Sequence, residues 1–334
     1  MGEIEIVPLE EARRRLGDEQ LAPRLAELKG LCFSTFEGVA WPTLAATRWY
    51  LARPGLDPAL GRVALLGDRL IGNAYVTRLT FPVGGRALRV GMFDTVMTHP
   101  AHRQQGIARR MLSAALADLA ARGWDAAALY TAPGSLPYGL YARLGFQPHR
   151  ASVIWRRERA GGEAPEGWAV RALAPEEQEP ARALANRAHA GEDGFVPVDE
   201  ALWRWRKWER PAERPARVLG AWQGERLAAT VTLCPLEVVT SHGPERSTYW
   251  VDLALEPGDE GPALRALLAA EAAPPLLALA GEDDARLAGL LAGEGFSPAP
   301  GEVCMLYPLA DAARAALEAP RRPWHALIES VVGI

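Results

Sequence analysis

A polar turn between two apolar segments offers groups that bind phosphate. Residues 103–108 read RQQGIA; the segment before them predicts a strand, and the Ala/Leu-rich segment after them predicts a helix. Backbone N–H groups at a helix start lack partners and lie at the positive end of the helix dipole. Gly106 lets the backbone approach an anion closely, and Arg103 and Arg109 supply charge-assisted hydrogen bonds. The turn therefore predicts a pyrophosphate site.

The chain also repeats itself at an offset of 157 residues. The turn at 67–70 (GDRL) recurs at 224–227 (GERL), and both sit between apolar runs that predict hairpins. The same offset relates two pairs of prolines, Pro54 with Pro211 and Pro100 with Pro257. Because these landmarks keep one order and one spacing, the sequence predicts two copies of one structural unit.

Each copy is predicted to be a mixed α/β domain. We expect a first domain at 1–157, a polar linker at 158–167, a second domain at 168–309 and a tail at 310–334. The apolar end of the tail, from Ile328 to Ile334, is expected to pack against a domain or a neighbouring subunit. The elements expected in the first copy are Ile4–Val7, Pro23–Phe33, Arg62–Leu66, Ile71–Leu79, Leu88–Met97, Ile107–Arg122, Ala126–Tyr130, Pro137–Leu144 and Ala151–Arg156.

The polar turn resembles the acetyl-CoA-binding motif of the GCN5-related N-acetyltransferases (GNATs), Q/R-x-x-G-x-G/A. Residues 98–100 (THP) before it and 141–146 (YARLGF) after it are also typical of that family, in the expected order. The resemblance implies two GNAT-like domains, each a mostly antiparallel mixed sheet flanked by helices. It also implies that acetyl-CoA is the cosubstrate. An ordinary solvated turn is the alternative for the glycine motif taken alone.

By the same resemblance, two central strands separate beside the turn, and the backbone of the first pairs with the pantetheine arm. The residues assigned to acetyl-CoA on this basis are Val96, Met97, Thr98, Arg103, Gln104, Gln105, Gly106, Ile107, Ala108 and Arg109.

Acetyl transfer to an amine needs a proton donor for the leaving thiolate and a base for the amine. Tyr141 occupies the position that donates this proton in similar enzymes, with Tyr138 as a second choice; the alternative is a tyrosine that only packs in the core. Asp94, on the strand before the turn, is the candidate base. A hydrogen-bonded structural carboxylate is an equal interpretation of Asp94.

The second copy keeps the predicted fold and loses the predicted site. Its turn is shorter, and Asp259 and Glu260 replace the arginine and glutamines, so it would repel pyrophosphate. Aligning the two Gly-Phe pairs places Leu291 opposite Tyr141. Such tandem chains resemble the Eis-type acetyltransferases, which use their terminal carboxylate as base. This chain ends in a short tail after Leu309, which puts that role for Ile334 in doubt.

Composition narrows the remaining choices. A net charge of −4 with 23% charged residues disfavours binding to nucleic acid, and no apolar run of membrane-spanning length occurs. The Trp- and Arg-rich segment 203–210 is expected to pack as a helix. The three cysteines form no pair motif, and His149, His189, His242 and His325 lack metal-ligand spacing, so we expect no metal. His99 and His102 are expected to be turn residues.

Together these features predict a cytoplasmic N-acetyltransferase that moves an acetyl group from acetyl-CoA to the amine of a small molecule or peptide by direct attack. A homo-oligomer is possible, and no nucleic-acid or membrane partner is expected. The alternative function is a non-catalytic acyl-CoA-binding or scaffold protein built from two GNAT-like domains.

Overall fold

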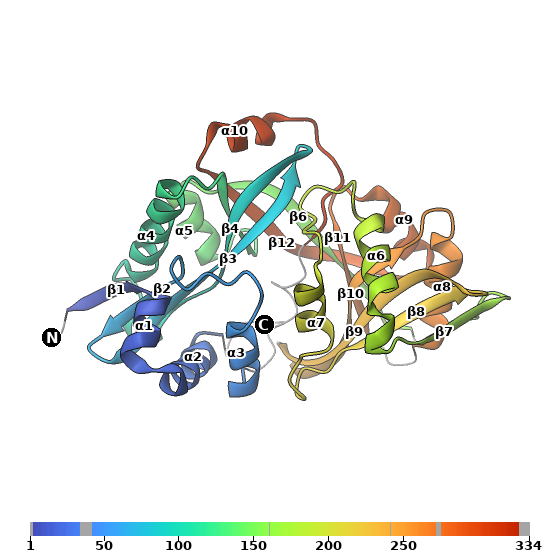
Figure 1. Ribbon diagram of the computed structural model, residues 1–334, viewed down its shortest axis with the longest axis horizontal. Helices are drawn as coiled ribbons and strands as arrows, with labels where there is room; N and C mark the ends of the chain where they lie inside the picture. Colours follow the sequence, from blue (N-terminus) through green and yellow to red (C-terminus); the bar gives the residue numbers. More distant parts are fainter. Residues whose placement is uncertain (1–2, 34–41, 160, 241, 272–274, 327–334) are drawn as a thin grey trace. The chain divides into compact units, whose positions relative to one another are not determined.

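The computed structural model describes the chain except for residues 1–2, 34–41, 160, 241, 272–274 and 327–334. It divides into two compact units (Figure 1). Unit 1 consists of the described residues of 1–150 and 302–320, and unit 2 consists of those of 151–301 and the segment from Arg321 to Ala326. None of the helices in the described residues is both long enough and apolar enough to cross a membrane.

Unit 1 is a mixed sheet with the strand order β1-β2-β3-β4-β5-β12. All neighbouring strands in it are antiparallel except β4 and β5. Helices α4 and α5 lie next to each other, and α1, α2 and α3 form a second group (Figure 1). Its elements are β1 (Ile4–Pro8), α1 (Leu9–Leu16), α2 (Asp18–Phe33), α3 (Leu44–Leu51), β2 (Arg62–Leu66), β3 (Arg69–Val83), β4 (Arg86–Thr98), η1 (Pro100–His102), α4 (Ile107–Ala121), β5 (Ala126–Thr131), α5 (Leu136–Leu144), β12 (Ser297–Pro308) and α10 (Asp311–Glu318).

Unit 2 has the same arrangement, with the strand order β7-β8-β9-β10-β11-β6. Its one parallel pair is β10 and β11. Its elements are β6 (Gln147–Arg157), β7 (Trp168–Ala172), η2 (Pro175–Glu177), α6 (Gln178–Ala188), α7 (Glu200–Lys207), β8 (Arg217–Gln223), β9 (Arg226–Thr240), β10 (Gly243–Leu255), α8 (Glu260–Ala270), β11 (Leu276–Gly281) and α9 (Ala285–Gly293). The expected fold class, two mostly antiparallel mixed sheets flanked by helices, is confirmed.

The units differ from the expected division in one respect, because the last strand of each copy completes the sheet of the other unit. Strand β6 pairs with β11 in unit 2, and β12 pairs with β5 in unit 1. Residues 158–167 therefore connect two strands of unit 2, β6 and β7, rather than two domains. Arg157 holds this connection with hydrogen bonds to the carbonyls of Arg159 and Gly161. Within the expected tail, α10 belongs to unit 1 and residues 321–326 belong to unit 2. The expected packing of Ile328–Ile334 lies outside the described residues.

The repeat is visible in backbone detail. The hairpin glycines Gly67 and Gly224 have φ angles of 59° and 60°. Strands β4 and β10 each contain a bulge that begins at a left-handed residue, Thr95 with φ 48° and Asp252 with φ 50°. These two positions are 157 residues apart, so the predicted offset holds at the level of single backbone angles.

The Trp- and Arg-rich segment is largely the helix α7, and it packs as expected. Trp203 and Trp205 are each 2% exposed. Lys207 is also buried, and its ammonium binds the carboxylate of Asp252 at the β10 bulge. Burial opposes the charged form of Lys207 and lowers the pKa of its ammonium, while Asp252 raises it.

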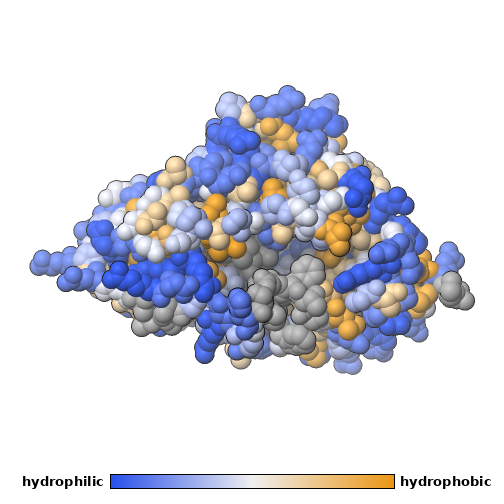
Figure 2. All heavy atoms as spheres, turned by 180° about the vertical axis from the view of Figure 1, so that it is seen from behind, coloured by the Kyte–Doolittle hydropathy of each residue, from blue (hydrophilic) through white to orange (hydrophobic). Residues whose placement is uncertain are grey.

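On the face drawn in Figure 2, hydrophobic residues form scattered groups among hydrophilic ones.

We expect Asp252→Asn to lower the free energy of unfolding by about 3–5 kcal/mol, because it leaves the buried Lys207 ammonium without its carboxylate. The double variant Lys207→Met/Asp252→Asn should recover part of this loss. Urea denaturation measures both, and Arg204→Met, an exposed change on the same helix, is the control. A loss below about 1 kcal/mol for Asp252→Asn would show that the pair does not hold the bulge.

Candidate functional site

The polar turn of unit 1 presents backbone amides at the start of helix α4. The first hydrogen bond of the helix runs from the Arg110 N–H to the Gly106 carbonyl, at 2.9 Å. The amides of residues 107–109 therefore come before the first intrahelical donor and have no acceptor within the helix. Gln104 and Gly106 both have left-handed backbones, with φ of 63° and 71°. Only glycine adopts this conformation without strain, so the turn needs Gly106 and carries strain at Gln104.

The side chains of the turn leave its anion-facing groups open. Those of Arg103, Gln104 and Gln105 are exposed, as is that of Arg109 in the first helical turn. A Cβ added at Gly106 would meet only the Arg109 guanidinium, at 3.9 Å. The space over Gly106 is therefore free for an anion, and two arginines lie close enough in the sequence to reach it.

Strands β4 and β5 separate beside this turn. Their parallel pairing covers only three residue pairs and ends at Met92 and Ala128. Beyond that point β4 bulges at Thr95 and Val96, and then pairs with β3 through Met97 and Thr98. The β5-facing side of the end of β4 has no strand partner among the described residues. Its backbone is therefore open to an extended ligand.

Thr98, near the end of β4, has a side-chain group whose hydrogen-bonding capacity the described residues leave unused. Its hydroxyl is buried and has no hydrogen-bond partner within the described chain. Its carbonyl accepts from the Cys32 thiol at 3.3 Å and lies 3.4 Å from Nε of Arg103. Because buried polar atoms are normally paired, the orphaned hydroxyl fits a position where a ligand supplies the partner.

Tyr141 lies over the point where the strands separate. It is held on α5, whose first turn is capped by the Ser135 hydroxyl, and it packs in one cluster with Phe93 of β4 and Leu129 of β5. Its side chain is buried, and no hydrogen bond joins its hydroxyl to another described residue. Burial, and next the carboxylate of Glu302, raises the pKa of the Tyr141 phenol. The phenol is therefore protonated at neutral pH, as a proton donor must be.

Asp94 is held by a buried cation. Its Oδ2 lies 2.6 Å from Nη2 of Arg53, and its Oδ1 accepts from the Thr95 hydroxyl at 2.8 Å. The Arg53 side chain is only 2% exposed and its guanidinium stacks 4.1 Å from the centre of the Tyr50 ring. Both carboxylate oxygens are thus engaged in fixing the bulge. This geometry supports the structural interpretation of Asp94, and its role as the base stays a prediction.

The histidines next to the turn have local partners. The Nδ1 of His99 accepts from the Ala101 N–H at 3.2 Å, which caps the short helix η1. Its ring borders a pocket of about 340 Å³ that is also lined by Arg24, Glu27 and Arg69. Partial burial, followed by Arg69, lowers the pKa of His99. His102 stacks on His99 with ring centres 5.4 Å apart.

Unit 2 keeps the same framework, but its own side chains occupy the corresponding positions. The Gly258 N–H donates to the Glu260 carboxylate at 2.7 Å, so an internal anion lies at the start of α8. The carbonyl of Leu253 in the bulge lies 3.1 Å from Nε2 of His189. Leu291 is fully buried, and its carbonyl accepts from Phe296 as that of Tyr141 accepts from Phe146. The alignment that placed Leu291 opposite Tyr141 therefore agrees with the structure.

Comparison with known proteins matches part of unit 1 to a known family. Residues 14–149 match the family model described as acetyltransferase (GNAT) domain. The first unit thus resembles a GNAT domain over residues 14–149. A protein of Streptomyces griseus named as an uncharacterized N-acetyltransferase is 32% identical over 156 residues, which are 42% of this chain and 35% of that protein. The chain thus matches about a third of the length of this relative.

Solved structures share the tandem GNAT fold at low sequence identity. A tandem GNAT protein from the clavulanic acid biosynthesis pathway has a TM-score of 0.66 and 17% identity, with 92% of this chain and 99% of that chain covered. Eis1 from Mycobacterium abscessus has a TM-score of 0.57 and 18% identity, with 94% and 76% covered. These likenesses confirm the expected GNAT resemblance and the tandem fold.

Pairs of residues that are far apart in the sequence were not predicted to be partners. Arg53 was not recognised as the partner of Asp94, which is 41 positions away. The indication in the sequence was that Arg53 comes shortly after the segment of the aromatic-containing helix α3. A cluster of His189, Glu192 and His325 in unit 2 was not predicted either, because 133 positions separate Glu192 from His325.

We expect Arg53→Met and Asp94→Asn to be strongly coupled in stability, because each leaves the other's charge poorly solvated in the bulge. Arg53→Met alone should cost about 2–4 kcal/mol of unfolding free energy, whereas Arg48→Met, at an exposed position on the preceding helix α3, should cost about 0.5 kcal/mol or less. A double-mutant cycle in urea measures the coupling energy. Additive losses would refute the assignment of this pair to the bulge.

Proposed function

We propose that unit 1 is an acetyl-CoA-dependent N-acetyltransferase whose acceptor is an amine on a small molecule or a peptide. One observation carries the proposal: a buried tyrosine packs over separated strands beside an amide-lined turn, all within the residues that match the GNAT domain model. The relative from Streptomyces griseus, which is named as an N-acetyltransferase, supports the same reaction class.

The turn would hold the pyrophosphate of acetyl-CoA. The amides at the start of α4 and the positive end of its dipole favour an anion there, and Arg103 and Arg109 add charge. Gln104 and Gln105 are further donors. The pantetheine arm would lie along Val96, Met97 and Thr98 and pair with their backbone. The orphaned Thr98 hydroxyl fits this placement, because an amide of the arm would satisfy it.

The chemistry is a direct transfer. The neutral amine nitrogen attacks the thioester carbonyl carbon, a C–N bond forms, and the C–S bond breaks with its electron pair on sulfur. Tyr141 donates its phenolic proton to that sulfur, and the proton leaving the amine goes to a base. Asp94 is the candidate base among the residues of the site. Arg53 and Thr95 engage both oxygens of Asp94, so Asp94 would take the proton from the amine through a bound water molecule rather than by direct contact.

Unit 2 would not bind a second acetyl-CoA. The Glu260 carboxylate already lies at the start of its helix α8, and His189 already bonds the carbonyl in its bulge. Leu291 stands at the position that corresponds to Tyr141. A structural or acceptor-shaping role is what remains for it. The alternative function, an acyl-CoA-binding protein without turnover, uses the same turn and strands and differs only in lacking transfer.

The direct test is an amine panel with acetyl-CoA, in which released CoA thiol is measured together with the thermal shift of the protein. We expect acetyl-CoA to raise the melting temperature and at least one amine to release thiol. Gly106→Ala should abolish most of the shift, because its Cβ would enter the space of the phosphate. Gly123→Ala, also at a left-handed position but at the other end of α4, is the matched control.

The outcomes of this panel separate the hypotheses. A thermal shift without thiol release from any amine would favour the acyl-CoA-binding protein. No shift at millimolar acetyl-CoA would contradict both functions.

We expect Tyr141→Phe to lower kcat by about 10²-fold or more while the KM for acetyl-CoA stays nearly constant, because only the departing thiolate needs the phenolic proton. Steady-state kinetics measure both parameters. Tyr307→Phe, whose ring packs against Phe146 in the same cluster, is the control and should leave both unchanged. A larger loss in Tyr138→Phe than in Tyr141→Phe would move the donor role to Tyr138.

A further inference from the structure

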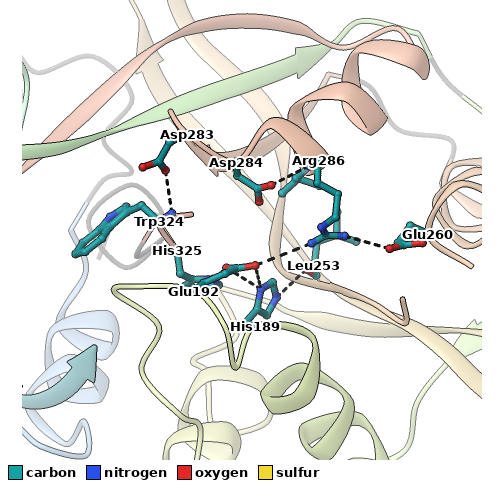
Figure 3. Close-up of polar contacts among 10 residues, drawn as sticks. His189, Glu192, Leu253, Glu260, Asp283, Asp284, Arg286, Trp324 and His325 are labelled. Carbon is teal, nitrogen blue, oxygen red and sulfur yellow. Dashed lines mark hydrogen bonds and ion pairs between the residues drawn. The ribbon is translucent and has the colours of Figure 1, made fainter. Parts of the chain in front are cut away.

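Two histidines of unit 2 meet around the carboxylate of Glu192. His189 lies just after the last residue of α6, Glu192 follows in the next turn, and His325 comes from the segment near the end of the chain (Figure 3). The Nδ1 atoms of both histidines lie 3.0 Å from Oε2 of Glu192. The two rings are in edge contact, with centres 4.5 Å apart. The three side chains are 7%, 11% and 16% exposed, so water reaches the cluster only in part.

The hydrogen bonds of His189 leave its Nδ1 with an unusual neighbour. Its Nε2 lies 3.1 Å from the Leu253 carbonyl, which only accepts, so Nε2 carries the hydrogen. The bulge in β10 makes this carbonyl available, since Leu253 has no partner in the ladder with β9. In the neutral ring Nδ1 then bears a lone pair that faces the lone pairs of a carboxylate. Either a second proton or a metal ion must lie between them.

A metal-binding histidine has this arrangement of bonds. It binds the metal through one nitrogen and donates the hydrogen of the other to a backbone carbonyl or a carboxylate, which fixes the ring. The ligand atoms of the cluster all lie within 4.8 Å of one another. Ligands at about 2.0–2.2 Å around a tetrahedral ion are about 3.3 Å apart, so small side-chain shifts would admit one.

We propose that His189, Glu192 and His325 bind a divalent transition-metal ion, Zn²⁺ by preference. Two imidazoles and one carboxylate are a ligand set that zinc uses, and three protein ligands leave a fourth position for water. The proposal goes beyond the acetyltransferase function and concerns unit 2 alone.

The surroundings hold the ligands in place. The His325 N–H donates to the Asp193 carbonyl, and the Asp193 N–H donates to the Pro323 carbonyl, so the chain on both sides of Trp324 is tied to the Glu192 turn. Trp324 is 1% exposed, and its N–H donates to the Asp283 carboxylate at 2.9 Å (Figure 3). Bound metal would thus fasten the segment at 321–326 to the body of unit 2.

One neighbour opposes a cation and offers a test. Nη2 of Arg286 lies 4.0 Å from Oε1 of Glu192, and the Arg286 side chain is 45% exposed. Removing its charge should strengthen metal binding by about fivefold, because a guanidinium this close to a ligand oxygen repels a bound cation, and two unit charges about 4 Å apart interact by about 1 kcal/mol in water. Misfolding cannot produce such a gain in affinity.

The experiment uses the full chain, treated with a chelator and dialysed, and then titrated with Zn²⁺ or Co²⁺ alone. We expect one ion per chain, visible Co²⁺ absorption typical of tetrahedral sites, and a higher melting temperature with Zn²⁺. His325→Ala should weaken binding by at least about 100-fold, because it removes a ligand. Exposed His242→Ala, also in unit 2, is the control and should bind as the unaltered chain does.

Three results would overturn the metal site. These are the absence of Zn²⁺ binding in the unaltered chain, an equal loss in His242→Ala and His325→Ala, or binding that Arg286→Gln weakens rather than strengthens. The first result would assign the cluster to a network in which protons, rather than a metal, join the two histidines to Glu192.

Discussion

Each unit is organised by a bulge that separates two parallel strands. The pairing of β4 with β5 and of β10 with β11 covers three residue pairs, and the bulges at Thr95 and Asp252 follow. A bulge releases backbone groups from the ladder, and buried backbone groups must be paired. The two units differ in the partners that these groups have.

The two copies meet this constraint differently. In unit 1 the bulge is fixed by the Arg53–Asp94 pair, and the strand beyond it offers its backbone to a ligand. In unit 2 the bulge is fixed by the Lys207–Asp252 pair, and its carbonyl is satisfied by His189. A carboxylate paired with a buried cation lies at both bulges, although the residues of the two pairs do not correspond under the 157-residue offset and the proposed site is present in one unit only. The presence of such a pair in both units argues that it stabilises the bulge whether or not the unit has a catalytic site.

Local signals predicted much of this structure, and distant pairings escaped them. The expected strand Arg62–Leu66 and the start of helix α4 at Ile107 match the structure, since apolar spacing and glycine turns act within a few residues. The exchange of β6 and β12 was not predicted, because the residues of a strand do not by themselves indicate which of two similar sheets it joins. The His189–Glu192–His325 cluster depends on a tail that docks more than a hundred residues away.

We propose that one of the two related units binds acetyl-CoA, whereas side chains of the protein itself occupy the corresponding positions in the other unit. Equilibrium dialysis of the full chain with labelled acetyl-CoA tests this most directly, because it counts sites without requiring an acceptor. We expect one molecule bound per chain. Two molecules per chain would contradict the occupied helix start at Glu260 in unit 2, and none would contradict the open turn at Gly106 in unit 1.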